Sequence, residues 1–224
     1  MEQIDPVREI LMQFREILKQ LAGKEEGKVE MEVMNQVSSS RDNFEAAEKI
    51  ANVLVAVKAE KMIEIFDAIK NHMDKLGYSK HLVHEEYRDE AIRYYEKNSF
   101  TWPSLNYNVP SASPEIGAKI VLRFEIGSQL YFGIAPWNPI IKKNSNPESR
   151  DGVIEKYVRD HLMPVACDGS KSKYWYWQRF IAEDIDFKRC NNAYKELYDR
   201  QAFQETIGRV LVEIADTLRV LMKA

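Results

Sequence analysis

Apolar residues recur every three or four positions at the start of the chain, the spacing of a helix that buries one side. Asp5-Pro6 supplies an N-cap residue and a proline at the first helical position, and Gly23 ends the pattern. The apolar positions between them are Val7, Ile10, Leu11, Phe14, Ile17, Leu18 and Leu21. The pattern therefore predicts an amphipathic helix over residues 5–23.

A second helical pattern begins near Asp42 and continues to Gly77, and its length leads us to expect a break near Glu60. Its apolar positions are Phe44, Ala47, Ile50, Ala51, Leu54, Val57, Met62, Ile65, Phe66, Ile69 and Met73. Residues 24–41 are polar and charged, and we interpret them as a connector. Two apolar stripes that face each other predict an antiparallel helical hairpin.

The pattern changes to strict alternation over residues 119–126. Ile120, Leu122, Phe124 and Ile126 fall on one side of a strand, and Val121, Arg123 and Glu125 fall on the other. This alternation is typical of a half-buried strand. Gly127-Ser128 provides a turn and residues 129–134 return as the partner strand, so the sequence predicts a β-hairpin.

The remaining patterns complete the fold class. Residues 142–152 are rich in Asn, Ser, Pro and charge, which indicates an exposed loop, and a short helix is expected over 151–161. Residues 174–180 alternate like another strand, and residues 201–222 show a final helical stripe. We expect an α+β protein with an N-terminal helical hairpin (residues 1–97), a small, mostly antiparallel sheet and a C-terminal helix (residues 98–224), joined in one compact unit.

Composition narrows the class of protein. The 32 basic and 35 acidic residues give a net charge of −3, so no strong field favours nucleic acid or membranes. No apolar run reaches the length of a membrane span, and we expect no signal peptide, because the first residues do not show a basic stretch followed by an apolar one. Cys167 and Cys190 lack metal-ligand spacing and are interpreted as free thiols, which favours a cytoplasmic location.

No familiar catalytic motif is visible. A metal-dependent nuclease needs an acidic residue and a Glu-x-Lys strand, but Glu26-Gly27-Lys28 lies in the expected connector and Glu125 has no lysine two residues later. His81 and His84 lack a third metal ligand. We therefore predict no catalytic residue, no metal and no cofactor in this chain.

Aromatic and basic residues of the second half are the candidate binding residues. They are Trp102, Trp137, Trp175, Trp177, Lys142, Lys143, Lys171, Lys173 and Arg179. Stacking on nucleobases or on aromatic side chains of a peptide, with phosphates held by the basic groups, is one interpretation. The alternative is that the tryptophans pack the core and the basic residues lie in a solvated loop. Trp175 and Trp177 are two residues apart, so we expect them on one face of a strand.

Several segments carry a resemblance when they are taken together. They are residues 14–21, residues 46–72, the strand pair 122–127 and 130–134, and Trp175-Tyr176-Trp177. In this order they resemble the region after the catalytic core in a group of bacterial PD-(D/E)XK nuclease-superfamily proteins. The resemblance implies that a full-length relative is a nuclease. The catalytic aspartate, the Glu-x-Lys strand and the glutamine helix of those proteins have no counterpart here. The resemblance thus implies a fragment of a larger gene or a stand-alone accessory protein.

Taken together, these features favour a non-catalytic accessory or recognition domain that binds a protein partner or nucleic acid. Protein contact, including self-association, ranks slightly above nucleic acid, because the helix over residues 44–73 has more apolar positions than one hairpin contact covers. A diverged nuclease or another enzyme with a dispersed site is the alternative. A structural oligomerisation module is a further alternative.

Overall fold

The computed structural model describes residues 26–85, 87–96, 102–109, 112–138, 151–162, 169–172 and 174–221, without the side chains of residues 26–30, 170, 171, 220 and 221. The helix predicted over residues 5–23 lies outside these ranges, as does most of the predicted loop 142–152. The chain divides into two compact units, Met1–Ala56 and Val57–Ala224. This division differs from the expected boundary at residue 97.

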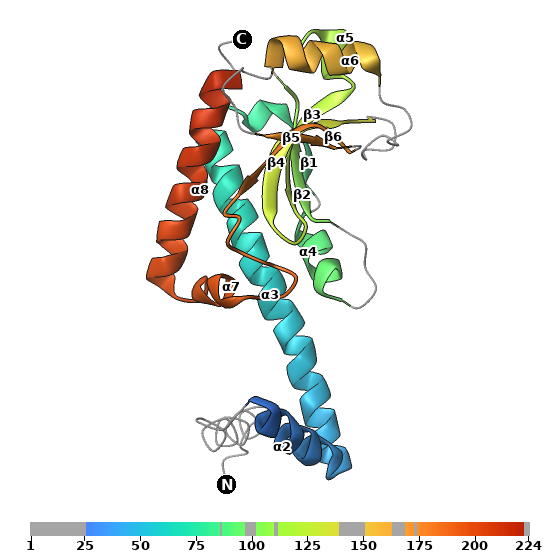
Figure 1. The fold of residues 1–224 in the computed structure, drawn as a ribbon, viewed down its shortest axis with the longest axis vertical. Helices are drawn as coiled ribbons and strands as arrows, with labels where there is room; N and C mark the ends of the chain where they lie inside the picture. The colour runs from blue at the N-terminus through green and yellow to red at the C-terminus, as the bar shows by residue number, and fades with distance from the viewer. Residues whose placement is uncertain are drawn as a thin grey trace. The chain divides into compact units, whose positions relative to one another are not determined.

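The predicted connector is a helix in the structure. Helix α2 spans Glu26–Ser38 (Figure 1). The prediction was wrong because Met31, Val33, Met34 and Val37 also follow helical spacing, although charged residues surround them. A Ser39-Ser40 turn follows, in which the Ser40 hydroxyl accepts a 3.1 Å hydrogen bond from the backbone N–H of Asn43. This contact caps the next helix.

Helix α3 runs without a break from Arg41 to Lys75. The break expected near Glu60 does not occur, because the segment contains neither glycine nor proline and helix-forming residues surround that position. Gly77, whose φ is 83°, ends the segment in the left-handed conformation that glycine adopts most readily. From Ala59 to Met73 one side of α3 is buried in the second unit.

Six described strands form one sheet in the second unit, in the order β1-β2-β3-β4-β6-β5, and all neighbours are antiparallel. The strands are β1 (Leu82–Glu85), β2 (Ser104–Tyr107), β3 (Ile120–Ile126), β4 (Leu130–Pro136), β5 (Ser170–Ser172) and β6 (Trp175–Ile181). The predicted hairpin is β3–β4, in which Ile126 pairs with Leu130. Together with the helices, this sheet confirms the α+β fold class.

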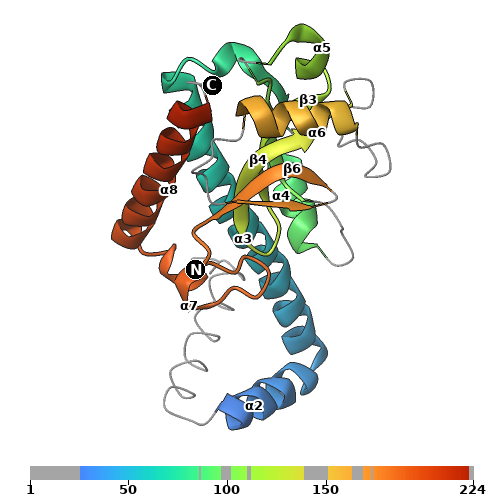
Figure 2. The same ribbon diagram turned by 45° about the horizontal axis from the view of Figure 1, so that its top comes forward.

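One face of the sheet, called here the first face, packs against α3 and α8 (Figure 2). The remaining helices are α4 (Tyr87–Tyr95), α5 (Pro114–Gly117), α6 (Gly152–Tyr157), α7 (Asn192–Glu196) and α8 (Arg200–Leu221). Helices α6 and α8 correspond to the predictions over 151–161 and 201–222. Leu122, Phe124 and Phe132 of the sheet join Phe66 of α3 and Ile214 of α8 in the main core.

The opposite face of the sheet, called here the second face, is also buried. All seven residues of β3 are buried, so the expectation of a half-buried strand was wrong. Arg123 and Glu125 can be buried because they form an ion pair with a 2.5 Å N–O distance. Their mutual attraction offsets the hydration that each charge loses on burial. A polar second face shielded from solvent is the feature that positions the candidate site.

Candidate functional site

Strand register sets the chemistry of the second face. Ser104, Glu125, Tyr131 and Phe180 stand in one row across β2, β3, β4 and β6. The neighbouring row across β1, β2, β3, β4 and β6 contains His84, Asn106, Arg123, Gly133 and Gln178. Buried polar side chains in two adjacent rows are unusual in a sheet, because each needs a hydrogen-bonding partner to offset its lost hydration.

The centre of these rows is a closed network. The carboxylate of Glu125 accepts hydrogen bonds from the Arg123 guanidinium and from the Tyr131 hydroxyl. Glu125 is 1% exposed, so this acid is neutralised within the protein rather than presented to solvent. Asn106 donates to the Ser104 hydroxyl at 3.3 Å, while its own Oδ1 is buried and has no partner among the described residues.

An aromatic pocket of about 600 Å³ lies beside this network. Its described lining consists of Tyr94, Trp102, Gly127, Ser128, Tyr131, Ser172, Tyr174, Trp175, Gln178, Phe180 and Lys188. Six of these residues are aromatic and they come from four separate stretches of the chain. Pockets of this size that combine apolar walls with a few polar groups are the usual binding sites for small ligands.

The inner wall of the pocket is a set of edge-to-face rings. The Tyr131 ring lies 5.4 Å from Trp175 and 5.6 Å from Phe180, with interplanar angles of 72° and 68°. Because its hydroxyl is anchored on Glu125, Tyr131 cannot turn freely. Trp102 and Tyr174 form a second edge-to-face pair at 6.4 Å, and Trp102 is 46% exposed. The pocket thus has a fixed inner wall and an accessible tryptophan.

Hydrogen bonds hold the remaining lining. The Tyr94 hydroxyl donates to the Gly127 carbonyl at 2.6 Å, and the backbone N–H of Phe187 donates to the Ser128 carbonyl at 2.8 Å. These bonds fix the β3–β4 turn against α4 and against the loop that carries Lys188.

Tyr94 and Tyr131 stay protonated at neutral pH. Burial raises the pKa of Tyr131, and the charge of Glu125 raises it further. Burial, followed by the charge of Asp186, raises the pKa of Tyr94. Both hydroxyls therefore act as hydrogen-bond donors rather than as bases.

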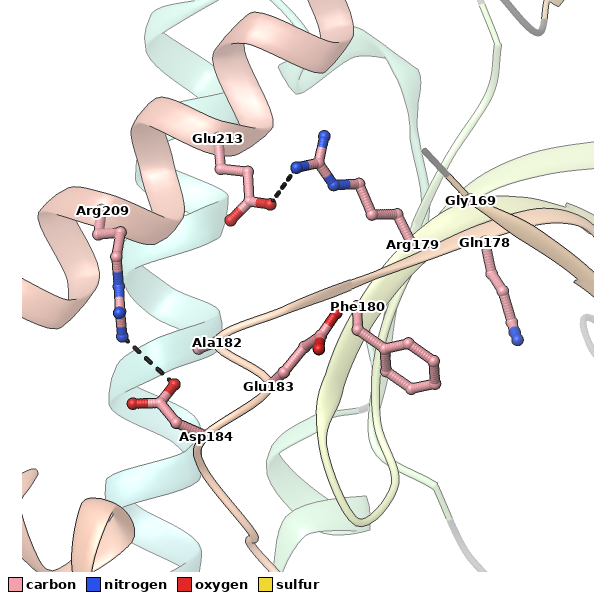
Figure 3. A pocket seen from close by; sticks show the side chains of 9 residues that line it. All are labelled: Gly169, Gln178, Arg179, Phe180, Ala182, Glu183, Asp184, Arg209 and Glu213. Carbon is pink, nitrogen blue, oxygen red and sulfur yellow. Dashed lines mark hydrogen bonds and ion pairs between the residues drawn. The ribbon is translucent and has the colours of Figure 1, made fainter. Parts of the chain in front are cut away.

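A larger cavity of about 790 Å³ lies between β6, the residues that follow it and α8 (Figure 3). Figure 3 shows Arg179 directed toward Glu213 and Arg209 toward Asp184, and the corresponding N–O distances are 2.7 and 3.4 Å. Its cations are already paired with carboxylates, and Glu183 adds a further acid. An anionic or aromatic ligand would therefore find fewer unpaired cations and fewer aromatic rings in this cavity than in the aromatic pocket.

The structure separates the predicted tryptophans. Trp102 and Trp175 line the aromatic pocket. Trp137 is buried elsewhere on the second face, and its ring centroid lies 5.9 Å from that of His84. Trp177 is fully buried in the main core, where its ring centroid lies 5.7 Å from that of Phe132. The expectation that Trp175 and Trp177 share one face was wrong. Pairing with β4 begins at Trp177 and the β5–β6 register shifts, so the alternation is interrupted between them.

Among the predicted basic residues, only Arg179 has a described side chain, and it does not line the aromatic pocket. Arg179 lies on the first face in its ion pair with Glu213, away from the aromatic lining. Lys142, Lys143 and Lys173 lie outside the described residues, and the side chain of Lys171 is not described. Lys188, which the sequence analysis did not single out, is the basic residue that lines the pocket.

Sequence reasoning also missed Tyr94, Tyr131 and Phe180. Tyr131 carried a usable signal, since its position in the predicted hairpin placed it on the same side as Arg123 and Glu125. Tyr94 and Phe180 carried none, because their approach to Tyr131 depends on how distant strands and helices pair.

The described residues give little support to three other features, namely a metal site, a site at the cysteine thiols and a membrane-spanning helix. Within the described ranges, no group of three His, Cys, Asp or Glu residues is arranged to hold a metal ion. Cys190 is a half-buried free thiol 3.5 Å from the Phe187 carbonyl oxygen, and Cys167 lies outside these ranges. None of the described helices is long and apolar enough to cross a membrane.

The first unit carries exposed apolar side chains. Phe44 is 59% exposed and Leu54 51% exposed on α3, and Met34 is 69% exposed on α2. Val53 and Met31 are exposed as well. Such a concentration of apolar side chains on two adjacent helices marks a surface suited to protein contact.

Comparison of the chain with protein-family models, with curated proteins and with solved structures found no match. The α+β fold and the aromatic pocket on the second face of its sheet are therefore the basis for the functional proposal.

Proposed function

We propose that this chain is a recognition domain that acts by binding, and that its aromatic pocket holds a base of single-stranded nucleic acid. The observation that carries the proposal is the pocket itself, in which six aromatic side chains and one lysine surround about 600 Å³. An unpaired base has two flat faces and a polar edge. The rings of the pocket suit the faces, and the hydroxyl group of Ser128 suits the edge.

The energetics favour recognition of single strands. Stacking of a base on an aromatic side chain contributes about 1–3 kcal/mol. A paired base within a duplex does not expose its faces, so the same pocket gains little from double-stranded nucleic acid. The net charge of −3 limits the long-range attraction, which makes stacking the main source of affinity.

The buried state of Glu125 supports binding rather than catalysis. This carboxylate already accepts bonds from Arg123 and Tyr131, it is 1% exposed, and it is not among the residues that line the pocket. A nuclease needs carboxylates that are free to hold a metal ion.

The proposal is tested by fluorescence anisotropy with a labelled single-stranded oligothymidylate and a duplex of the same length. Wild-type protein is expected to prefer the single strand. Trp102→Ala is expected to weaken binding by about 1–3 kcal/mol, because one stacking surface is lost. Phe44→Ala is the matched control, since it removes an aromatic side chain of similar exposure from the first unit. Equal binding by wild-type and Trp102→Ala protein would contradict the proposal.

A second candidate function is contact with a protein partner through the exposed apolar residues of α2 and α3 in the first unit. Its support is the exposure of Met34, Phe44 and Leu54. Sedimentation velocity tests self-association at this surface. A wild-type chain that associates should become monomeric with Leu54→Glu, whereas Val153→Glu, at an exposed position of α6, should leave association unchanged. Association that persists in Leu54→Glu would exclude this surface.

The relationship to PD-(D/E)XK nucleases and the cytoplasmic location are further proposals. A recognition domain of this kind would suit a nuclease system, because it would select the nucleic acid on which a separate catalytic core acts. An upstream Asp…Glu-x-Lys in the same open reading frame would test the relationship directly. The half-buried free thiol of Cys190 suits a reducing compartment.

A further inference from the structure

Lys188 is the only charged side chain among the described residues that line the aromatic pocket. It is exposed, and no described carboxylate forms an ion pair with its ammonium group. A cation that is not neutralised at the edge of an aromatic pocket is suited to an anionic group on a ligand whose ring lies inside.

The position of Lys188 is set by the backbone around it. The Asp186 carboxylate accepts hydrogen bonds from the backbone N–H groups of Lys188 and Arg189, at 3.0 and 2.8 Å. The backbone N–H of Phe187 donates to the Ser128 carbonyl, and Ser128 itself lines the pocket. The two bonds to Asp186 set the conformation of the Lys188 loop, and the bond from Phe187 to Ser128 joins that loop to the pocket wall.

Glu125 and Asp186 both accept hydrogen bonds within the protein. Glu125 is held by Arg123 and Tyr131, and the Asp186 carboxylate is occupied by backbone N–H groups. The charge of Glu125 is offset by Arg123, so Glu125 repels an anion at Lys188 less than an unpaired carboxylate would.

We infer that the unit which the pocket binds is one nucleotide, with its base among the aromatic rings and its phosphate on Lys188. This inference rests on the proposed function and makes its ligand more specific. The volume of about 600 Å³ falls within the range of about 300–1,000 Å³ that pockets for single small ligands occupy, and it does not suit a stacked run of bases. A free nucleoside monophosphate is therefore a sufficient ligand.

Isothermal titration calorimetry tests this inference with thymidine monophosphate, thymidine and inorganic phosphate as separate ligands. Wild-type protein is expected to bind the monophosphate roughly three- to tenfold more tightly than thymidine, the gain from one exposed ion pair with a hydrogen bond. Lys188→Gln should remove this difference, so that the monophosphate and thymidine bind the variant with similar affinity. Lys195→Gln is the matched control, because Lys195 is exposed on α7 and does not line the pocket.

The outcomes separate this inference from the proposed function. The role proposed for Lys188 is wrong if thymidine monophosphate and thymidine bind wild-type protein equally. It is also wrong if Lys188→Gln leaves the ratio of their dissociation constants unchanged. If inorganic phosphate binds as tightly as the monophosphate, the base is not held and the inference is also wrong. If an oligothymidylate binds while neither monomer does, the single-nucleotide inference fails and the proposed function stands. If the oligothymidylate does not bind either, both fail.

Discussion

At the scale of single residues, Trp175 and Trp177 show that neighbouring tryptophans of one strand can have different roles. Trp175 supports the pocket from the second face, and Trp177 fills the main core beside Phe132. Trp102, by contrast, is half exposed and lines the pocket rather than filling the core. The three residues therefore predict different effects on stability and on binding.

Trp177→Ala should lower the free energy of unfolding by about 3–5 kcal/mol, because it leaves a large cavity among fully buried side chains. Trp102→Ala should change it by less than about 1 kcal/mol, since its side chain is already in contact with solvent. Chemical denaturation with intrinsic fluorescence or circular dichroism measures both values. Wild-type stability in Trp177→Ala would show that this residue is not part of the core.

The sequence alone could predict that the tryptophans of this strand are buried, but not which face each one joins. Alternation assigns faces only while the pairing register is regular. The shift between Ser170 and Ser172 interrupts the register beside Trp175, and it depends on a partner strand that carries little pattern of its own. Lys188 was missed for a similar reason, because its loop reaches the pocket through tertiary contacts such as the bond from Phe187 to Ser128.

At the scale of secondary-structure elements, the pairing of β4 with β6 is the contact on which the pocket depends. Tyr131 and Phe180 face each other only because these strands lie close together, and Gly133 permits that approach. A Cβ atom at Gly133 would lie 2.0 Å from the Trp177 carbonyl oxygen and 2.7 Å from the Gln178 Cα. Both are backbone atoms of a paired strand, so a small rotation of a side chain cannot relieve the clash.

Gly133→Ala should therefore destabilise the protein by about 1–3 kcal/mol or more and weaken ligand binding as well, because β6 must move away from β4. Gly208→Ala is the matched control on α8, where a Cβ atom meets nothing within 4 Å. That change should stabilise the protein by about 0.5–1 kcal/mol, since alanine loses less backbone entropy in a helix than glycine does. Thermal and chemical unfolding of the two variants give the comparison. Two variants of equal stability would contradict the close approach at Gly133.

Elements with strong local patterns were predicted well and elements without them were not. The β3–β4 hairpin and α8 have regular apolar spacing and occur where the sequence predicts them. Helix α2 was missed because charged residues obscure its apolar positions, and the continuity of α3 was missed because length was taken as a reason for a break. Neither error concerns the sheet that forms the pocket.

At the scale of the whole molecule, buried tyrosines make stability sensitive to alkaline pH. Burial is the largest cause of a raised pKa for Tyr94, Tyr95, Tyr107, Tyr131 and Tyr194. In the unfolded chain the same groups lose their protons near a pKa of about 10. The folded state therefore keeps more protons than the unfolded state above this pH, and stability falls as pH rises.

We expect stability from these tyrosines to be fully present below pH of about 10 and to decline progressively above it. The measurement is a pH titration that follows tyrosinate absorbance and far-ultraviolet circular dichroism together. Ionisation of the buried tyrosines should coincide with loss of secondary structure. Complete ionisation of the tyrosines near pH 10 in a chain that stays folded would contradict their burial.

The division at Ala56/Val57 also belongs to this scale, and the sequence did not reveal it. Helix α3 has apolar residues on both sides of the boundary, and only contacts with the sheet decide which of them are buried. Ala59 and Met62 pack in the core, whereas Val53 and Leu54 are exposed. The pocket and the exposed apolar residues thus lie in separate units, which allows each binding proposal to be tested without the other.

The most direct test of the account is to locate the ligand on the protein. A single-stranded oligonucleotide that contains iodouracil would be photo-crosslinked to the wild-type chain, and the modified residues would be identified by mass spectrometry. The account predicts crosslinks at residues of the aromatic pocket, with Trp102 and Tyr174 at its accessible side. Crosslinks confined to α2 and α3 of the first unit, or to the cavity between β6 and α8, would contradict it.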